Sequence, residues 1–240
     1  MFLSPGLSSA LDRIAERAAD VRRAYTPGAI PQHDDVATAA STSDFSLDPL
    51  AVVVPDGAYL VTADDHGRRA YTRNGALALE GGRLVDGSGH PIYGRREPDG
   101  VLVELAVDPL DAALARVRDP AVEADGTFVY RREVVDPRSG MREQQRIAAG
   151  RVALTRFPAG TKLQTSDGSH VTAVSGVPSR EGVPGDGTFA PLRPMHRERS
   201  RIDIDESLVR LKEAYLAFDA LAAAEAAKLR FSKATMDIVK

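Results

Sequence analysis

Residues 51–87 read AVVVPDGAYLVTADDHGRRAYTRNGALALEGGRLVDG. Short runs of Val, Leu, Tyr and Ala alternate in this stretch with turn-forming pairs such as Asn-Gly, Gly-Gly and Asp-Gly. Runs of this length between tight turns are typical of antiparallel strands joined by hairpins. The close spacing leaves no room for the helices that connect parallel strands, so the stretch argues against a nucleotide-binding α/β fold.

The same pattern continues along the chain to about residue 200. Further short strands are expected at 101–105, 127–131, 152–157 and 170–174. Residues 112–117 fit either a strand or a single helical turn. Residues 27–49 contain few large apolar side chains and predict an extended linker. A β-rich middle domain is therefore expected over residues 50–200.

The N-terminal residues, 1–26, follow a helical period instead. Apolar side chains three or four residues apart form one seam of the predicted helix: Leu7, Leu11, Ile14, Ala18, Val21 and Tyr25. Ser4 can cap this helix and Pro5 suits its first turn. Thr26-Pro27-Gly28 is expected to end it.

Residues 201–240 predict a second and longer helix with the same spacing. Its seam runs through Leu208, Leu211, Tyr215, Phe218, Ala222, Glu225, Leu229, Ser232, Met236 and Val239. A 3.5-residue repeat held over about five heptads is the pattern of coiled coils. We therefore expect this helix to pack against the N-terminal helix of the same chain, against helices of other copies, or against both.

These patterns predict an α+β fold, in which discontinuous, coiled-coil-like N- and C-terminal helices flank a mainly antiparallel β middle domain. With 240 residues and 43 % hydrophobic content, the chain can bury a sizeable core. Only 5 % of the residues are aromatic, so Val, Leu, Ile and Ala must form most of that core.

Composition excludes several classes of function. A net charge of -3 lacks the positive field that nonspecific nucleic-acid binding needs, so no nucleic-acid partner is expected. The absence of cysteine excludes disulfides, thiolate metal sites and a cysteine nucleophile. No apolar window approaches the ~20 residues of a membrane span. The first residues also lack the apolar run of a cleavable secretory signal.

Candidate catalytic groups are sparse. The histidines lie apart and never recur at helical spacing: positions 33, 66, 90, 170 and 196. Asp64-Asp65-His66 could offer metal ligands, but it contains the residues that a hairpin turn needs. Residues 86–90, Asp-Gly-Ser-Gly-His, lack the pattern of a serine nucleophile elbow and predict a plain turn. The sequence therefore predicts no catalytic residue, no cofactor and no metal ion.

The β region contains two distinctive motifs. One is Tyr71, Thr72, Arg73, Asn74 and Gly75, and the other is Gly-x-Leu-Val-x-x-x-Gly-x-Pro with Leu84, Val85, Gly89 and Pro91. They resemble the signature of bacterial flagellar rod and hook proteins, which has Tyr-Thr-Arg-Asp/Asn-Gly followed by Gly-x-Leu-Val-x-x-x-Gly-x-Pro. Further segments are similar to the family's in the same order: 123–128, 152–158, 175–178, 200–209 and 217–219.

This resemblance implies a structural protein and not an enzyme. Members of the family are exported unfolded by the flagellar type III apparatus and assemble helically, through their terminal helices, into the rod that transmits motor torque. The implied partners are further copies of the chain, other rod and hook proteins, and the export apparatus. The implied location is the periplasmic rod of the flagellar basal body, reached without a cleaved signal peptide. The modest length favours a proximal rod protein, with a distal rod or hook subunit second.

Two other classes fit the residues when the resemblance is set aside. One is an enzyme of unknown class, which would need a pocket that gathers histidines and carboxylates. The other is a β-rich binding or adhesion module held on a helical stalk.

Overall fold

The structure, a computed structural model, describes residues 4–29, 42–64, 66–96, 100–135, 141–161, 163–167, 169–173 and 179–238. The chain forms two compact units, a helical unit from Met1–Ala24 and Ile202–Lys240 and a β unit from Tyr25–Arg201. Several predicted features lie outside the described residues: part of the linker at 30–41, His33, Asp65, Val174, the match at 175–178 and Val239.

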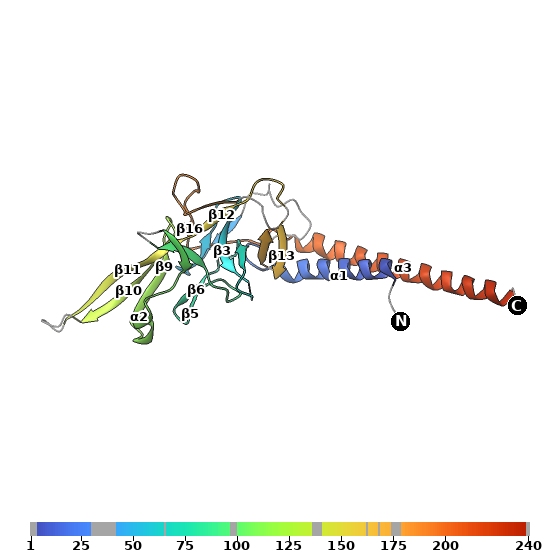
Figure 1. The fold of residues 1–240 in the computed structure, drawn as a ribbon, viewed down its shortest axis with the longest axis horizontal. Helices are drawn as coiled ribbons and strands as arrows, with labels where there is room; N and C mark the ends of the chain where they lie inside the picture. Colours follow the sequence, from blue (N-terminus) through green and yellow to red (C-terminus); the bar gives the residue numbers. More distant parts are fainter. Residues whose placement is uncertain are drawn as a thin grey trace. The chain divides into compact units, whose positions relative to one another are not determined.

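The helical unit pairs α1 (Pro5–Arg23) with α3 (Ile204–Ile238), and the two helices run antiparallel (Figure 1). Ser4 caps α1, because its hydroxyl accepts a hydrogen bond from the Leu7 N–H at 3.3 Å. The same hydroxyl donates to Glu225 of α3. With 19 residues in α1 and 35 in α3, the longer helix continues past the start of the shorter one.

The helix α3 has only part of its predicted seam covered, in which Leu211, Phe218, Ala222 and Glu225 are half-buried. Its half-buried positions recur every three or four residues and include Ile204, Ser207, Leu211, Ala214, Phe218, Leu221 and Glu225. The other half of the predicted seam is exposed, with 47 % of Leu208, 51 % of Tyr215 and 64 % of Leu229 accessible to solvent. Knobs-into-holes packing needs both rows enclosed, so the expectation of coiled-coil-like ends is wrong for the single chain.

On α1 the predicted seam is also unevenly covered. Ile14 is buried, whereas Leu7, Ala18 and Val21 are half-buried. Leu11 is exposed. The side chain of Met236, in the last turns of α3, lies outside the description.

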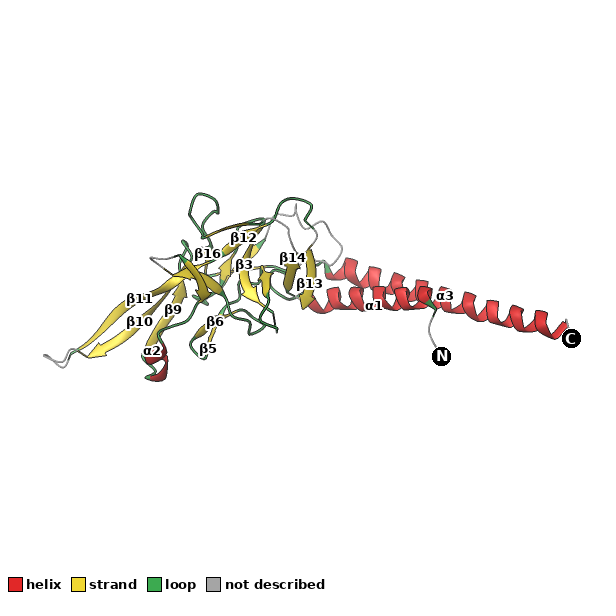
Figure 2. Ribbon diagram, viewed as in Figure 1, coloured by secondary structure: helices red, strands yellow, loops and turns green. Residues whose placement is uncertain are grey.

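The β unit forms five sheets from the described residues, and every strand pair in them is antiparallel (Figure 2). The six-stranded sheet has the order β13 (Leu163–Asp167), β14 (His170–Ala173), β4 (Arg69–Thr72), β3 (Ala58–Ala63), β12 (Leu154–Arg156) and β15 (Arg180–Gly182). The five-stranded sheet has the order β8 (Val101–Glu104), β7 (Tyr93–Arg96), β11 (Arg142–Val152), β10 (Thr127–Val135) and β9 (Val117–Val122). A short helix, α2 (Pro109–Ala113), precedes β9.

Three two-stranded sheets complete the β unit, and two of them join its beginning to its end. The strand β1 (Ser43–Phe45) pairs with β17 (His196–Glu198), and β2 (Val52–Val53) pairs with β16 (Arg193–Pro194). The third is the hairpin of β5 (Ala78–Glu80) and β6 (Arg83–Val85). The Arg201 N–H also donates to the Ala29 carbonyl at 3.0 Å. The first and last segments of the β unit are therefore fastened to each other.

The sheets enclose one main hydrophobic core and a smaller second one. The main core contains Leu50, Val52, Val54, Ala58, Leu60, Leu77, Leu84, Ile92, Leu105, Val107, Val122, Phe128, Tyr130, Val152, Leu154, Phe189 and Leu192. The second core contains Tyr59, Val61, Tyr71 and Ala153, and Phe157 packs edge-on to Tyr71 with ring centres 4.9 Å apart. Each large apolar side chain buried in this way contributes about 1.5–3 kcal/mol.

The predicted α+β class is wrong, because the described residues form seventeen strands and only three helices. The order of a helix, a β region and a second helix is nevertheless present. Several strands were not predicted, among them β11, whose side chains are mostly polar and exposed and give no apolar alternation. The segment 112–117, which fitted either element, contains the end of α2 and the start of β9. Asp108 caps α2 by accepting from the Leu110 N–H at 2.8 Å.

Candidate functional site

The first motif, residues 71–75, lies at the end of β4 and in the turn that follows, and it is buried. The exposed fractions are 8 % for Tyr71, 0 % for Thr72, 2 % for Arg73 and 4 % for Asn74. A motif that faced a partner or a substrate would be accessible in the isolated chain. These side chains therefore act inside the β unit.

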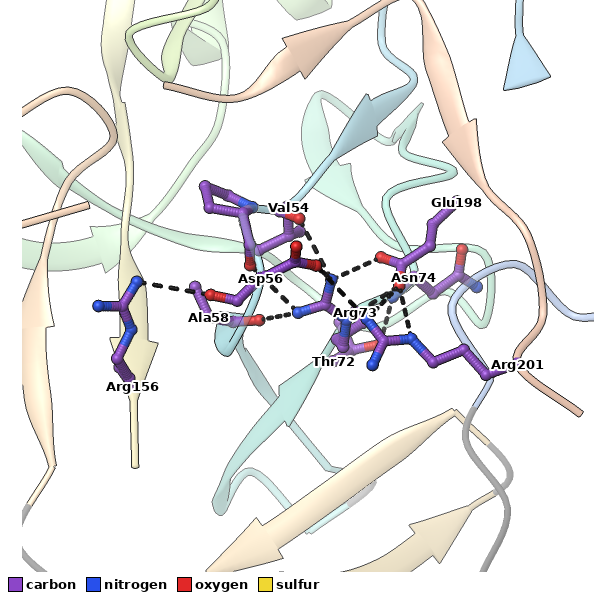
Figure 3. A network of polar contacts seen from close by, with 10 residues as sticks. Val54, Asp56, Ala58, Thr72, Arg73, Asn74, Arg156, Glu198 and Arg201 are labelled. Atoms are coloured by element: carbon purple, nitrogen blue, oxygen red, sulfur yellow. Dashed lines mark hydrogen bonds and ion pairs between the residues drawn. The ribbon is translucent and has the colours of Figure 1, made fainter. Parts of the chain in front are cut away.

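Arg73 is the centre of this motif, and all five of its N–H donors are satisfied (Figure 3). Its Nε and Nη2 donate to the two carboxylate oxygens of Glu198 at 3.1 and 2.9 Å. The remaining hydrogens reach backbone carbonyls: Ala58 at 2.7 Å, Val54 at 3.2 Å and Pro55 at 3.2 Å.

Glu198 is as deeply buried as Arg73 and has a second cationic partner. The guanidinium of Arg201 donates to its Oε1 from Nε at 3.3 Å and from Nη2 at 3.1 Å. The exposed fractions of the Arg73 and Glu198 side chains are 2 % and 0 %. Since a buried charge is costly unless it is paired and hydrogen-bonded, this network requires both partners. It joins the turn after β4 to the strand β17 near the end of the β unit.

The neighbours of Arg73 hold the turn in place. Thr72 donates its hydroxyl to the Ser169 carbonyl at 3.0 Å and accepts from the Asn74 N–H at the same distance. Asn74 accepts from the Ala76 N–H through its side-chain oxygen at 3.1 Å. Gly75 lies so close to β2 that a Cβ there would be 1.9 Å from the Val52 carbonyl oxygen. Thr72, Asn74 and Gly75 thus each have an identifiable role in closing the turn, whereas Tyr71 belongs to the second hydrophobic core.

The second motif is buried at Leu84 and Val85, half-buried at Pro91 and exposed at Gly89. Leu84 and Val85 are core residues of β6, with 0 % and 4 % exposure. Gly89 has φ +86, which favours glycine in the turn. Pro91 forms a β-bridge with Val85, and its carbonyl accepts from the Thr62 hydroxyl at 2.9 Å. Both motifs are therefore framework elements of one β unit.

Asp64, which was considered as a metal ligand with Asp65 and His66, is used as a turn acceptor. Its carboxylate accepts from the His66 N–H at 2.9 Å, the Arg68 N–H at 2.8 Å and Arg68 Nε at 2.8 Å. Burial raises the pKa of this carboxyl, but the hydrogen bonds from Arg68 and His66 outweigh it, and the net pKa lies below the ordinary 3.8.

Asp64→Asn should therefore destabilise the β unit in a pH-dependent way. A carboxyl whose pKa is lower in the folded state stabilises the fold above its unfolded pKa of about 3.9, and this contribution is lost as pH falls through the folded value. Urea unfolding at neutral pH should give the variant a lower free energy of unfolding than the parent. This gap in free energy should narrow below about pH 4. A gap that stays constant from neutral pH into that acid range would contradict this account.

The structure brings together histidines that the sequence placed apart. Asp86 lies between two imidazoles, with its Oδ2 2.5 Å from Nε2 of His170 and its Oδ1 3.8 Å from Nδ1 of His90. The two imidazole rings meet edge to face at 4.5 Å. The expected turn at 86–90 is confirmed, since Asp86 accepts from the Ser88 and His90 N–H groups at 2.8 and 3.1 Å. The spacing of residues in the sequence could not reveal this cluster, because His170 lies 84 positions after Asp86.

No protein-family model matches this chain, and no curated protein matches it either.

A polar groove of about 490 Å³ lies on the five-stranded sheet. It contains two carboxylates, Glu123 and Asp125, but its lining includes no histidine among the described residues. Glu123 is paired with Arg146 at 2.7 Å. Burial raises the pKa of Asp125. Hydrogen bonds from Thr127 and the charge of Arg151 lower this pKa by more than burial raises it, so the net pKa is below 3.8. A carboxylate of this kind remains ionised near neutral pH and is a poor general acid.

None of the helices formed by the described residues has the length of apolar sequence that a bilayer crossing requires. The surface of α3 nevertheless carries large apolar side chains. We define the exposed stripe as Leu208, Tyr215 and Leu229, which recur at multiples of seven residues and so share one side of the helix. Val209, Leu216 and Phe231 are exposed elsewhere on α3.

Proposed function

We propose that this chain is a structural subunit of the bacterial flagellar basal-body rod, which assembles helically through its terminal helices and transmits torque. The proposal rests on the resemblance of residues 71–75 and 84–91 to rod and hook proteins. The single structural observation that carries it is the exposed stripe on α3. A surface of this kind is what a subunit needs when neighbouring copies cover it in the assembled state.

The length of α3 supports this reading. At 1.5 Å per residue, α1 spans about 28 Å and α3 about 52 Å. Ser4, immediately before α1, contacts Glu225, so the part of α3 beyond Glu225 extends past α1 (Figure 1). Leu229 and Phe231 lie in that part, with 64 % and 75 % exposure. Burial of such a side chain contributes about 1.5–3 kcal/mol, which gives neighbouring subunits a driving force for assembly.

The β unit has the properties of a rigid body in such an assembly. The Arg73–Glu198 network and the pairs β1–β17 and β2–β16 fasten its ends to each other. The carboxylates of the described groove are held by arginines and backbone donors, which favours a structural role over catalysis. The proposed partners are other copies, other rod and hook proteins, and the flagellar type III export apparatus, and the proposed location is the periplasmic rod.

The modest length favours a proximal rod subunit over a distal rod or hook subunit. Deletion of the gene in its own bacterium tests the proposal. Isolated basal bodies should lack the rod, and swimming should be lost until the gene is restored. Complete rods in the deletion strain would overturn the proposal and favour a binding or adhesion module instead.

Replacing two side chains of the exposed stripe should block assembly without unfolding the β unit. Tyr215→Asp combined with Leu229→Asp removes about 3–6 kcal/mol of burial per contact between copies, so association should weaken at least about 100-fold. The measurement is the fraction of cells with complete rods, together with swimming on soft agar.

Ala224→Asp is the matched control, because Ala224 is exposed on α3 and lies on the side opposite the exposed stripe. It should assemble normally. Normal rods from the double variant would show that the stripe is not an assembly surface.

A further inference from the structure

The cluster of Asp86, His90 and His170 is not used by the proposed assembly. Asp86 and His90 belong to the turn after β6, and His170 is the first residue of β14. The side chains of Asp86 and His170 are completely buried, and 11 % of His90 is exposed. The ligand-type atoms of the three residues all lie within 4.8 Å of one another.

The surrounding hydrogen bonds orient these groups toward a common point. The backbone N–H groups of Ser88 and His90 hold Asp86 Oδ1, which fixes the carboxylate in its turn. Ser169 Oγ lies 3.4 Å from Nδ1 of His170, so the other ring nitrogen, Nε2, is directed at Asp86 Oδ2. An outer partner on the second ring nitrogen is the usual arrangement around a metal-binding histidine.

A simple buried ion pair would explain the contact between Asp86 and His170, but it would not explain the second imidazole beside the same carboxylate. Here two imidazoles meet at one carboxylate, and His90 at the edge of the cluster gives access from solvent. Two imidazole nitrogens and a carboxylate oxygen form a donor set that suits Zn²⁺ and its neighbours among the transition metals. Ca²⁺ and Mg²⁺ prefer oxygen ligands throughout, so this set disfavours them.

We propose that Asp86, His90 and His170 bind one divalent transition-metal ion, with Zn²⁺ as the best fit. Bond lengths of about 2.0–2.2 Å would place the ligand atoms roughly 3.3–3.6 Å apart in a tetrahedral site. The Asp86–His170 distance of 2.5 Å would open and the Asp86–His90 distance of 3.8 Å would close slightly. The metal would take the place of a hydrogen on Nε2 of His170, this proton would be released to solvent, and a water molecule beside His90 would complete the coordination.

The role of this ion is structural, because the cluster lies inside the β unit. It links the turn at 86–90 to β14, a hairpin strand of the six-stranded sheet. An ion that binds only the folded chain raises its stability in proportion to the logarithm of the metal concentration.

The test is a metal titration of the full-length protein after treatment with a chelator. Zn²⁺ should bind with one equivalent per chain, and at about 100 times its Kd it should raise the Tm by roughly 5–10 °C. Co²⁺ serves as a spectroscopic probe, since a low-symmetry nitrogen and oxygen site gives visible absorption bands that hydrated Co²⁺ lacks.

His90→Ala is the informative variant, because it removes a ligand from the edge of the cluster and leaves the Asp86–His170 contact in place. It should weaken Zn²⁺ binding at least tenfold while the metal-free protein keeps its circular-dichroism spectrum. His66→Ala, at an exposed histidine outside the cluster, is the matched control and should bind like the parent. No Zn²⁺-dependent rise in Tm, or equal binding by both variants, would overturn the proposal.

Discussion

Replacing Arg73 with alanine should lower the free energy of unfolding of the β unit by about 3–5 kcal/mol, the usual cost of removing one partner from a buried ion pair. The guanidinium is 2 % exposed and donates to Glu198 and to three backbone carbonyls. Its loss removes five hydrogen bonds from the protein interior, although Arg201 still donates to Oε1 of Glu198. Urea unfolding followed by tyrosine fluorescence and circular dichroism measures the change.

Two further variants separate the contributions of charge and geometry. Arg73→Lys keeps the positive charge but offers three donors instead of five, so it should lie between the parent and the alanine variant. Arg146→Ala removes a guanidinium with similar contacts to a carboxylate, at 2.7 and 2.8 Å from Glu123, but both side chains are about half exposed. It should cost less than about 1 kcal/mol. Equal losses from Arg73→Ala and Arg146→Ala would refute the special role of Arg73.

Gly75→Ala should destabilise the β unit by at least about 3 kcal/mol, at the upper end of the range for overpacking. A Cβ at this position would lie 1.9 Å from the Val52 carbonyl oxygen. The Val52 N–H donates to the Gly75 carbonyl at 2.9 Å, and Val52 is completely buried. The added methyl group must therefore push β2 away from the turn and break this hydrogen bond.

Gly81→Ala is the control for the conformational part of the effect. Gly81 has φ +55 in the hairpin between β5 and β6, and a Cβ there would meet nothing within 4 Å. It should cost about 1–2 kcal/mol through backbone strain alone. A smaller loss of unfolding free energy for Gly75→Ala than for Gly81→Ala would show that β2 can move away from the turn without destabilising the β unit.

The local parts of the fold were predictable, and the distant pairings were not. Helix seams and hairpin turns arise from residues a few positions apart, so the two long helices and strands such as β3, β4 and β6 follow from the sequence. The polar strand β11 gives no apolar alternation and becomes a strand by pairing with β10 along its length and with β7 at its end. The strand β1 falls within the predicted linker, because its partner β17 lies about 150 residues away in the chain.

The candidate site shows the same difference between local features, which the sequence predicts, and contacts between distant residues, which it does not. The residues of the first motif were identified from their resemblance, but nothing near Arg73 indicates that its partner is Glu198, 125 positions later. The histidine cluster was missed for a related reason, since only the pairing of β14 with β4 places His170 beside the turn at 86–90. On α3 the spacing predicted an apolar seam, but which row would face α1 depends on the packing of the pair.

The position of Glu198 near the end of the β unit also affects when this unit can fold during synthesis. A ribosome that makes this protein from its N-terminus delivers β2, β3 and the arginine-bearing turn long before β16 and β17 emerge. Until then Arg73 lacks Glu198, its bidentate partner, and the carboxylate of the largely exposed Asp56 lies 4.0 Å away in the folded structure. Burial of the guanidinium before Glu198 is present is therefore opposed by the cost of desolvating its charge. The last strand of the β unit, β17, therefore supplies the carboxylate that allows Arg73 to be buried. In a nascent chain with this order, the Arg73–Glu198 ion pair can form only after β17 has been synthesised.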